Sequence, residues 1–131
     1  MRFYRVAEQK LTAASVLRDN GLFRDATYLA GYGFECGLKC LILKWTPPSG
    51  HQQFIDDRFR GARAHDFSFL LELLRINRVS LPVPQRRQVV RAGAIWTVDL
   101  RYQPGKGRAD EADELIVSAT AFLEWVKGKM Q

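Results

Sequence analysis

Cysteine and histidine are scarce in this sequence, which has two of each among its 131 residues. Cys36 and Cys40 lie four residues apart in a strongly helical segment, and no second cysteine or histidine pair is present to complete a zinc site. We therefore expect two small core residues in a reducing compartment, not a disulfide or a redox centre. Asp56 and Asp57 with one histidine also lack a metal-ligand spacing, so we expect neither a metal nor another cofactor.

Long hydrophobic runs are absent as well. The longest, CLILKW at residues 40–45, is far too short to span a bilayer. The first residues, MRFYRVAEQK, contain no apolar core of a signal peptide. We expect a soluble cytoplasmic protein that does not enter a membrane. Because the chain has no internal repeat and no clear linker, we predict one domain over residues 1–131, long enough to build a single core.

Acidic residues are few in the middle of the chain. Positions 58–108 hold eleven lysines and arginines but only three acids, Asp66, Glu72 and Asp99, in a chain of net charge +6. This asymmetry indicates an anionic partner such as RNA, a nucleotide or an acidic protein. The alternative is a solvated basic face that keeps the protein soluble, and the sequence leaves both open.

Proline occurs only between the apolar segments, at positions 47, 48, 82, 84 and 104, and divides the chain into helical pieces. Apolar residues recur at steps of three and four over about 2–19, 22–45, 67–77, 84–99 and from 109 onward. Asp66 is the expected N-cap of the third of these helices, and residues 46–64 form a polar connection with room for a short helical turn. No segment alternates as a strand does. The sequence predicts an all-α fold, an antiparallel up-and-down bundle of four to five helices.

The second predicted helix has a face of small residues and one charged pair. Ala26, Ala30, Gly33 and Gly37 would let another helix approach closely, which must offset a cost of about 1 kcal/mol for each glycine. We take this face, with the apolar excess on short helices, as the motive for a homodimer. On the same helix, Glu35 and Lys39 have the spacing of an ion pair. We interpret them as a structural polar cluster, in which a partly buried carboxylate would need Arg101 or another cation; a ligand contact is the alternative.

The stretch VDLRYQPGKGRADEADEL, residues 98–115, carries the most concentrated candidate chemistry. It is not a Walker loop, because the lysine is not followed by serine or threonine and the preceding segment is a helix. Arg101, Lys106 and Arg108 nevertheless surround the entrance to the last helix, where an anion is favoured. Four acids in the first turns of that helix oppose an anion: Asp110, Glu111, Asp113 and Glu114. The alternative is a plain connection whose cations pair with these acids.

Three segments together resemble the HEPN domain family (higher eukaryotes and prokaryotes nucleotide-binding): DATYLAGYGFECGLKCLILKW, HDFSFLLELL and the W…LRY before the last helix. The resemblance implies a helical bundle that commonly dimerises. It also implies a minimal nucleotidyltransferase as partner in a two-gene, toxin–antitoxin type system. Members are either toxin ribonucleases or non-catalytic binding domains. The nucleases are metal-independent and use an R-x(4–6)-H motif, in which the arginine steadies the phosphate charge and the histidine transfers protons.

This chain departs from the family at that motif. Arg101 aligns with the arginine, but positions 106 to 108, where the histidine should fall, are lysine, glycine and arginine, which are not general bases near neutral pH. The spacing does occur as Arg58-x6-His65 and Arg60-x4-His65, although in a predicted loop before the third helix. There, His65 is expected to help start its helix beside Asp66.

We therefore predict a binding protein without nuclease chemistry, for a nucleotide, an RNA phosphate or a nucleotidyltransferase partner. Its predicted anion contacts are Arg101, Tyr102, Lys106 and Arg108. Arg101 would bind phosphate in a bidentate manner, and Tyr102 would stack on a base or simply pack. Glu35 and Lys39 would not contact the ligand but would hold these four residues in position. The alternative is a ribonuclease toxin that uses Arg58 or Arg60 with His65, or Arg101 with a non-standard base. A pure dimerisation scaffold is a third possibility.

Overall fold

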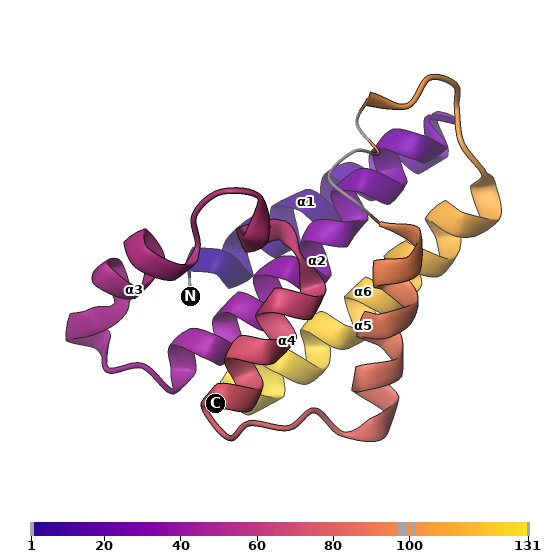
Figure 1. Cartoon of the computed structure of the whole chain (residues 1–131). Helices are drawn as coiled ribbons and strands as arrows, with labels where there is room; N and C mark the ends of the chain where they lie inside the picture. The colour runs from indigo at the N-terminus through magenta and orange to yellow at the C-terminus, as the bar shows by residue number, and fades with distance from the viewer. Residues whose placement is uncertain (1, 97–99, 101, 131) are drawn as a thin grey trace.

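The computed structural model describes residues 2–96, 100 and 102–130, which fold into helices and connections without a strand (Figure 1). The long helices are α1 (Arg2–Asp19), α2 (Phe23–Lys44), α4 (Phe67–Ile76), α5 (Val83–Ile95) and α6 (Ala109–Met130). A short helix, α3 (His51–Arg58), lies between the 3-10 turns η1 (Pro48–Gly50) and η2 (Ala62–His65). The all-α class is confirmed. The described residues hold one helix more than the four to five predicted, because α3 extends what was expected to be a short turn.

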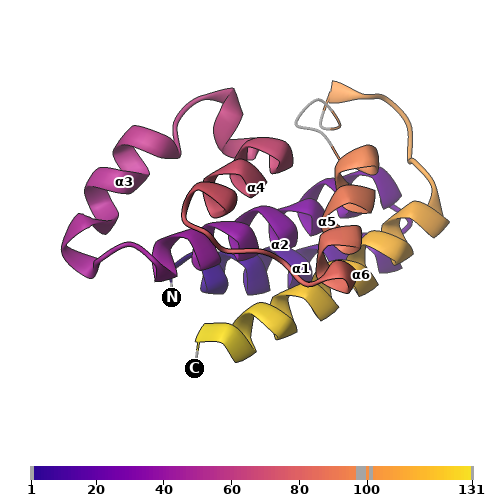
Figure 2. The same ribbon diagram turned by 60° about the horizontal axis from the view of Figure 1, so that its bottom comes forward.

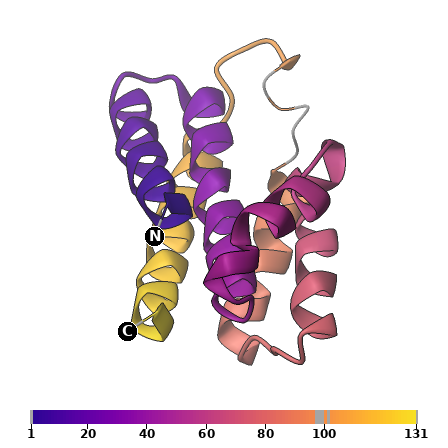
Figure 3. The same ribbon diagram turned by 90° about the vertical axis from the view of Figure 1, so that its left-hand side faces the viewer.

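Helix α2 lies at the centre of the bundle and is buried along most of its length. It forms an antiparallel hairpin with α1, and α6 packs along both of them. Helices α4 and α5 cover the other side of α2, as the view in Figure 3 shows. Short connections join α1 to α2 and α4 to α5, which places these neighbours antiparallel, whereas longer segments join α2 to α4 and α5 to α6.

The small residues of α2 serve this packing. A Cβ atom added at Gly33 would lie 3.0 Å from the Cβ of Ala119 on α6, and one at Gly37 would lie 2.8 Å from the ring of Phe122. One added at Gly31 would lie 2.2 Å from the indole of Trp96, at the end of α5. The predicted tight packing is confirmed, but the face is covered within the chain. A second copy of the chain therefore cannot pack on this face, and the face no longer supports the prediction of a homodimer.

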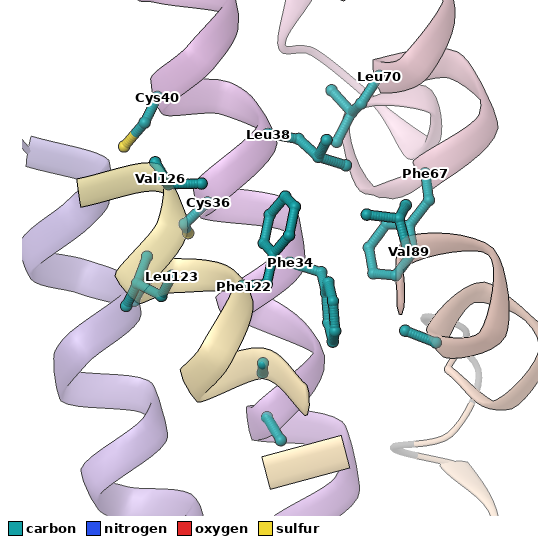
Figure 4. Packing of buried hydrophobic residues seen from close by; sticks show 14 of the residues in the cluster. Phe34, Cys36, Leu38, Cys40, Phe67, Leu70, Val89, Phe122, Leu123 and Val126 are labelled. Atoms are coloured by element: carbon teal, nitrogen blue, oxygen red, sulfur yellow. The ribbon is translucent and has the colours of Figure 1, made fainter. Parts of the chain in front are cut away.

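Aromatic rings fill the space between α2, α4, α5 and α6. The ring centroids of Phe34 and Phe122 are 5.2 Å apart, and Phe67 stacks on Trp96 at 5.0 Å with an angle of 11° between the ring planes. Figure 4 shows how Phe34 and Phe122 meet beside Leu38. This contiguous core fixes the position of α2, and hence of the polar side chains that α2 carries.

The two cysteines are free and buried, as predicted. Burial raises the pKa of the Cys36 thiol to about 12 and that of Cys40 to about 11, which keeps both thiols protonated. Protonated buried thiols are poor nucleophiles and poor metal ligands. Among the described residues, no group of three or more histidine, cysteine or acidic side chains could hold a metal ion. None of the described helices is both long and apolar enough to cross a bilayer.

Candidate functional site

A cleft of about 370 Å³ lies where the N-terminus of α2 meets the end of α5 and the loop before α6. One wall is apolar and is formed by Ala94, Ile95 and Leu100. The remaining lining residues carry polar side chains or exposed backbone, namely Arg24, Thr27, Gln103, Gly107, Arg108 and Glu111. The cleft thus combines a small apolar wall with two guanidinium groups.

The loop is fastened to α2 through Arg24. The backbone N–H of Arg24 donates to the carbonyl of Lys106 over 2.6 Å, and Arg24 Nη1 donates to Oε1 of Gln103 over 2.5 Å. Gly107 has a φ of +79°, and an added Cβ there would lie 2.8 Å from the backbone nitrogen of Arg24. Only glycine satisfies both conditions without strain. The loop therefore meets the first turn of α2 at a defined place.

The Arg24 guanidinium is incompletely satisfied. Its Nε is buried and has no hydrogen-bond partner among the described atoms. A buried donor on a charged group usually has an acceptor, and leaving it unpaired costs free energy. Arg24 was not identified from the sequence, since nothing in its local pattern shows that it faces a loop 79 residues further on.

Of the predicted anion contacts that the structure describes, Arg108 lines the cleft and Tyr102 and Lys106 do not. Arg108 lines the cleft, but its guanidinium also forms hydrogen bonds of 3.0 and 2.5 Å with the carboxylate of Asp110. The side chains of Tyr102 and Lys106 are exposed, and neither is among the residues that line the cleft. Arg101 lies outside the described residues.

The acids at the start of α6 are paired with arginines. Hydrogen bonds from Arg108 lower the pKa of Asp110, and those from Arg18 lower the pKa of Asp113. Arg91 does the same for Glu114, with 2.7 Å between its Nε and the nearer carboxylate oxygen. Arg108 thus pairs with acids at the start of α6, as expected if this segment is a plain connection between helices. The same pairing reduces the repulsion that the acids would exert on an anion.

A second polar cluster lies inside the bundle, around Glu35. Its side chain is 3% exposed, and its two carboxylate oxygens are paired separately, with Lys39 Nζ at 3.0 Å and with His65 Nδ1 at 2.8 Å. The ammonium of Lys39 also lies over the rings of Phe3 and Phe59, 5.5 and 5.1 Å from their centroids. The predicted contact between Glu35 and Lys39 is observed, with His65 as a further partner of the carboxylate.

This cluster does not line the cleft. Glu35 is eleven residues after Arg24 on the same helix, about 16 Å along its axis. Lys39 is one turn further away. Glu35 pairs with His65, and Lys39 lies over the ring of Phe59 just after α3. Among the described residues, neither forms an ion pair with the part of the chain around Arg108.

His65 turns into the bundle instead of capping the helix that follows it. The N-cap of α4 is Asp66, as predicted, whose carboxylate accepts from the backbone N–H of Ser68 over 2.8 Å. The side chain of His65 remains 36% exposed beside Glu35. Arg58 and Arg60 are exposed, and in the described part of the chain neither forms an ion pair.

In comparisons with protein families, curated proteins and solved structures, nothing matches this chain.

Proposed function

We propose that the protein binds a phosphate-bearing ligand, a nucleotide or an RNA phosphate, in the cleft at the start of α2 and does not cleave it. The observation that carries this proposal is the buried Nε of Arg24, which has no acceptor among the described residues and lies beside a cleft of about 370 Å³. Nη1 is already bonded to Gln103. An anion would therefore meet the edge formed by Nε and Nη2, which suits two phosphate oxygens at once. Gln103 is exposed and can turn aside to admit it.

Other features of the cleft favour the same ligand. The N-terminus of α2 carries a partial positive charge. Arg108 adds a second guanidinium, and the wall of Ala94, Ile95 and Leu100 offers an apolar surface for a base. The described lining contains no histidine, and Glu111 is its one carboxylate. These residues favour binding over proton transfer.

Arg24→Gln tests the proposal directly. In titrations of labelled ATP and of a short RNA, we expect this variant to bind at least about tenfold more weakly, because hydrogen bonds to charged groups contribute roughly 1.5–3 kcal/mol. Arg5→Gln removes the same charge from an exposed site on α1 and is the matched control. Equal affinities of wild type and Arg24→Gln would contradict the proposal. Arg101→Ala in the same titration tests the prediction made from the sequence.

A metal-independent ribonuclease is the second candidate, and the hydrogen bond between Glu35 and His65 favours it. With Nδ1 held by Oε1 of Glu35, His65 has Nε2 left for proton transfer, in the arrangement that general acid–base catalysis requires. Arg58 and Arg60 in the preceding segment would supply the phosphate contact. If the wild type cleaves RNA or arrests growth on expression, and His65→Ala abolishes the effect, the binding-only proposal is wrong.

The resemblance to HEPN proteins supports two proposals about partners, a second copy of the chain and a minimal nucleotidyltransferase of a toxin–antitoxin type pair. Two aliphatic side chains on the outer face of α5, Val83 and Val90, are 61% and 58% exposed and offer an apolar surface for such a partner. Co-purification with the product of the neighbouring gene tests the second of these proposals.

A further inference from the structure

A second cavity, of about 350 Å³, lies at the opposite end of α2, beneath α3. It is bordered by the first residues of α1, the end of α2, α3 and the end of α6. Helix α3 has no buried residue, and Figures 1 and 2 show it standing apart from the other helices. The helix therefore covers a cavity and does not pack tightly onto the core. This cavity shares no lining residue with the cleft around Arg24.

The wall of this cavity is mainly apolar. Phe3, Leu43, Ile55 and Met130 contribute half-buried side chains from four different elements. Cys40 adds its buried thiol, which is uncharged because burial raises its pKa to about 11. An apolar wall of this extent accepts the hydrocarbon part of a ligand more readily than it accepts ordered water.

The charged groups at the cavity are of one sign. Arg2 and Lys44 line it, together with His51, and among its described lining residues there is no aspartate or glutamate. Lys44 donates a hydrogen bond to the carbonyl of Lys129, which keeps its ammonium at this end of the bundle. A negative charge at the mouth of the cavity would be attracted, and a positive charge would be repelled.

We propose that this cavity binds a small amphiphilic carboxylate of the medium-chain fatty acid class. A volume of about 350 Å³ accommodates roughly twelve heavy atoms at ~30 Å³ each. A ten-carbon chain with its carboxylate has that size. The chain would lie between Leu43, Ile55 and Met130, and the carboxylate would face Arg2 and Lys44. This site does not depend on the proposed phosphate binding.

Calorimetric titration of the full chain with decanoate, below the concentration at which it forms micelles, is the first test. We expect saturable binding of one decanoate for each chain. Decyltrimethylammonium has the same chain with the opposite charge and should bind at least tenfold more weakly, and acetate should not bind at the same concentration. Lack of saturable decanoate binding, or equal affinity for the cation, would overturn the proposal.

The two cysteines locate the ligand without any substitution. Cys40 borders the cavity, whereas Cys36 is buried one turn earlier and does not. Decanoate should slow the alkylation of Cys40 by a small thiol reagent more than that of Cys36. Trypsin cleaves after Lys39, so the two cysteines are measured on separate peptides. Equal slowing at both cysteines would place the ligand elsewhere and would contradict the proposal.

Ile55→Trp would fill the cavity from a half-buried position on α3, and we expect at least a tenfold loss of decanoate affinity. Val16→Trp adds the same bulk at an exposed site on α1 and should leave the affinity unchanged. Circular dichroism establishes that both variants are folded. A folded Ile55→Trp protein that binds decanoate as the wild type does would refute the site. Should this variant not fold, the Cys40 measurement on the wild type decides the question.

Discussion

Gly31 is the position where a single methyl group has the least room. An added Cβ would lie 2.2 Å from the Trp96 indole, whose Nε1 is fixed by donating to the carbonyl of Tyr28 over 2.7 Å. The rigid ring cannot turn away as a flexible side chain could. The opposite holds at Gly128 in α6, where nothing lies within 4 Å of an added Cβ.

We predict that Gly31→Ala lowers the free energy of unfolding by about 1–3 kcal/mol, the usual cost of overpacking a core. Gly128→Ala is the matched control and should raise it by up to about 1 kcal/mol, since alanine is the better helix former. Urea unfolding measures both. A Gly31→Ala protein as stable as the wild type would show that Trp96 is not held where the structure places it.

Lys39 is the second residue whose replacement has a definite expected cost. Glu35 and Lys39 are buried, so Lys39→Met would leave the Glu35 carboxylate with His65 as its remaining ion-pair partner among the described residues. We predict a loss of about 3–5 kcal/mol for this single change. In the double variant with Glu35→Gln the loss should be clearly smaller than the sum of the two single losses. Additive losses in urea unfolding would show that the two charges do not interact.

At the scale of the helices, arginines connect the start of α6 to its neighbours. Arg18 of α1 bonds to Asp113 over 2.5 Å, and Arg91 of α5 bonds to Glu114 over 2.7 Å. Both carboxyl groups have a lowered pKa in the folded protein because of these hydrogen bonds. Their contribution to stability is therefore present above the pKa of the unfolded chain and is lost as the pH falls through the lower folded value.

We predict that the stability contributed by these pairs is constant above about pH 5 and falls below about pH 4, near the usual pKa of aspartate. Asp113→Asn should be less stable than the wild type at pH 7, and the difference should shrink as the pH approaches 2. Arg18→Gln removes the other partner and should show the same convergence. A difference that stays constant down to pH 2 in urea unfolding would contradict the assigned pairing.

The limits of α1, α2 and α4 could be predicted to within one residue because their buried apolar residues leave a periodic signal in the sequence. The N-cap at Asp66 was predicted for a similar reason, since its hydrogen bonds are local. Helix α5 was predicted to run to residue 99 but ends at Ile95, where the backbone of Trp96 is already extended. Helix α3 was underestimated because none of its residues is buried, so tertiary packing gives it no periodic pattern. Two of its side-chain hydrogen bonds, from Gln52 to Asp56 and from Gln53 to Asp57, lie within the helix, and a third joins His51 to the carbonyl of Thr46 just before it.

At the scale of the whole molecule, the candidate site was only partly predictable. Arg108 and the pair of Glu35 and Lys39 were identified from motif and spacing. Arg24 and Gln103 were not, because their contact joins positions far apart in the chain and depends on the complete fold. His65 was assigned to the start of a helix, whereas the folded chain brings it to Glu35, thirty residues earlier.

The oligomeric state also belongs to this scale. If a second copy covers the outer face of α5, light scattering at micromolar concentration should show a species of twice 15.0 kDa. Val90→Asp should then restore the monomer mass, because it places a charge in an apolar interface. Val16→Asp on α1, where the side chain is 56% exposed, is the matched control and should leave the dimer intact. A 15.0 kDa species for the wild type would reject the homodimer.

The contact between Gly31 and Trp96 has a consequence for how this chain can evolve. A larger residue at position 31 becomes tolerable only after the indole has been replaced by a smaller side chain, so the order of the two changes is constrained. Related chains should consequently show the two positions varying together: glycine where the aromatic residue is large, and alanine or serine where it is small. This paired substitution offers a way to recognise distant relatives whose overall identity is too low to detect.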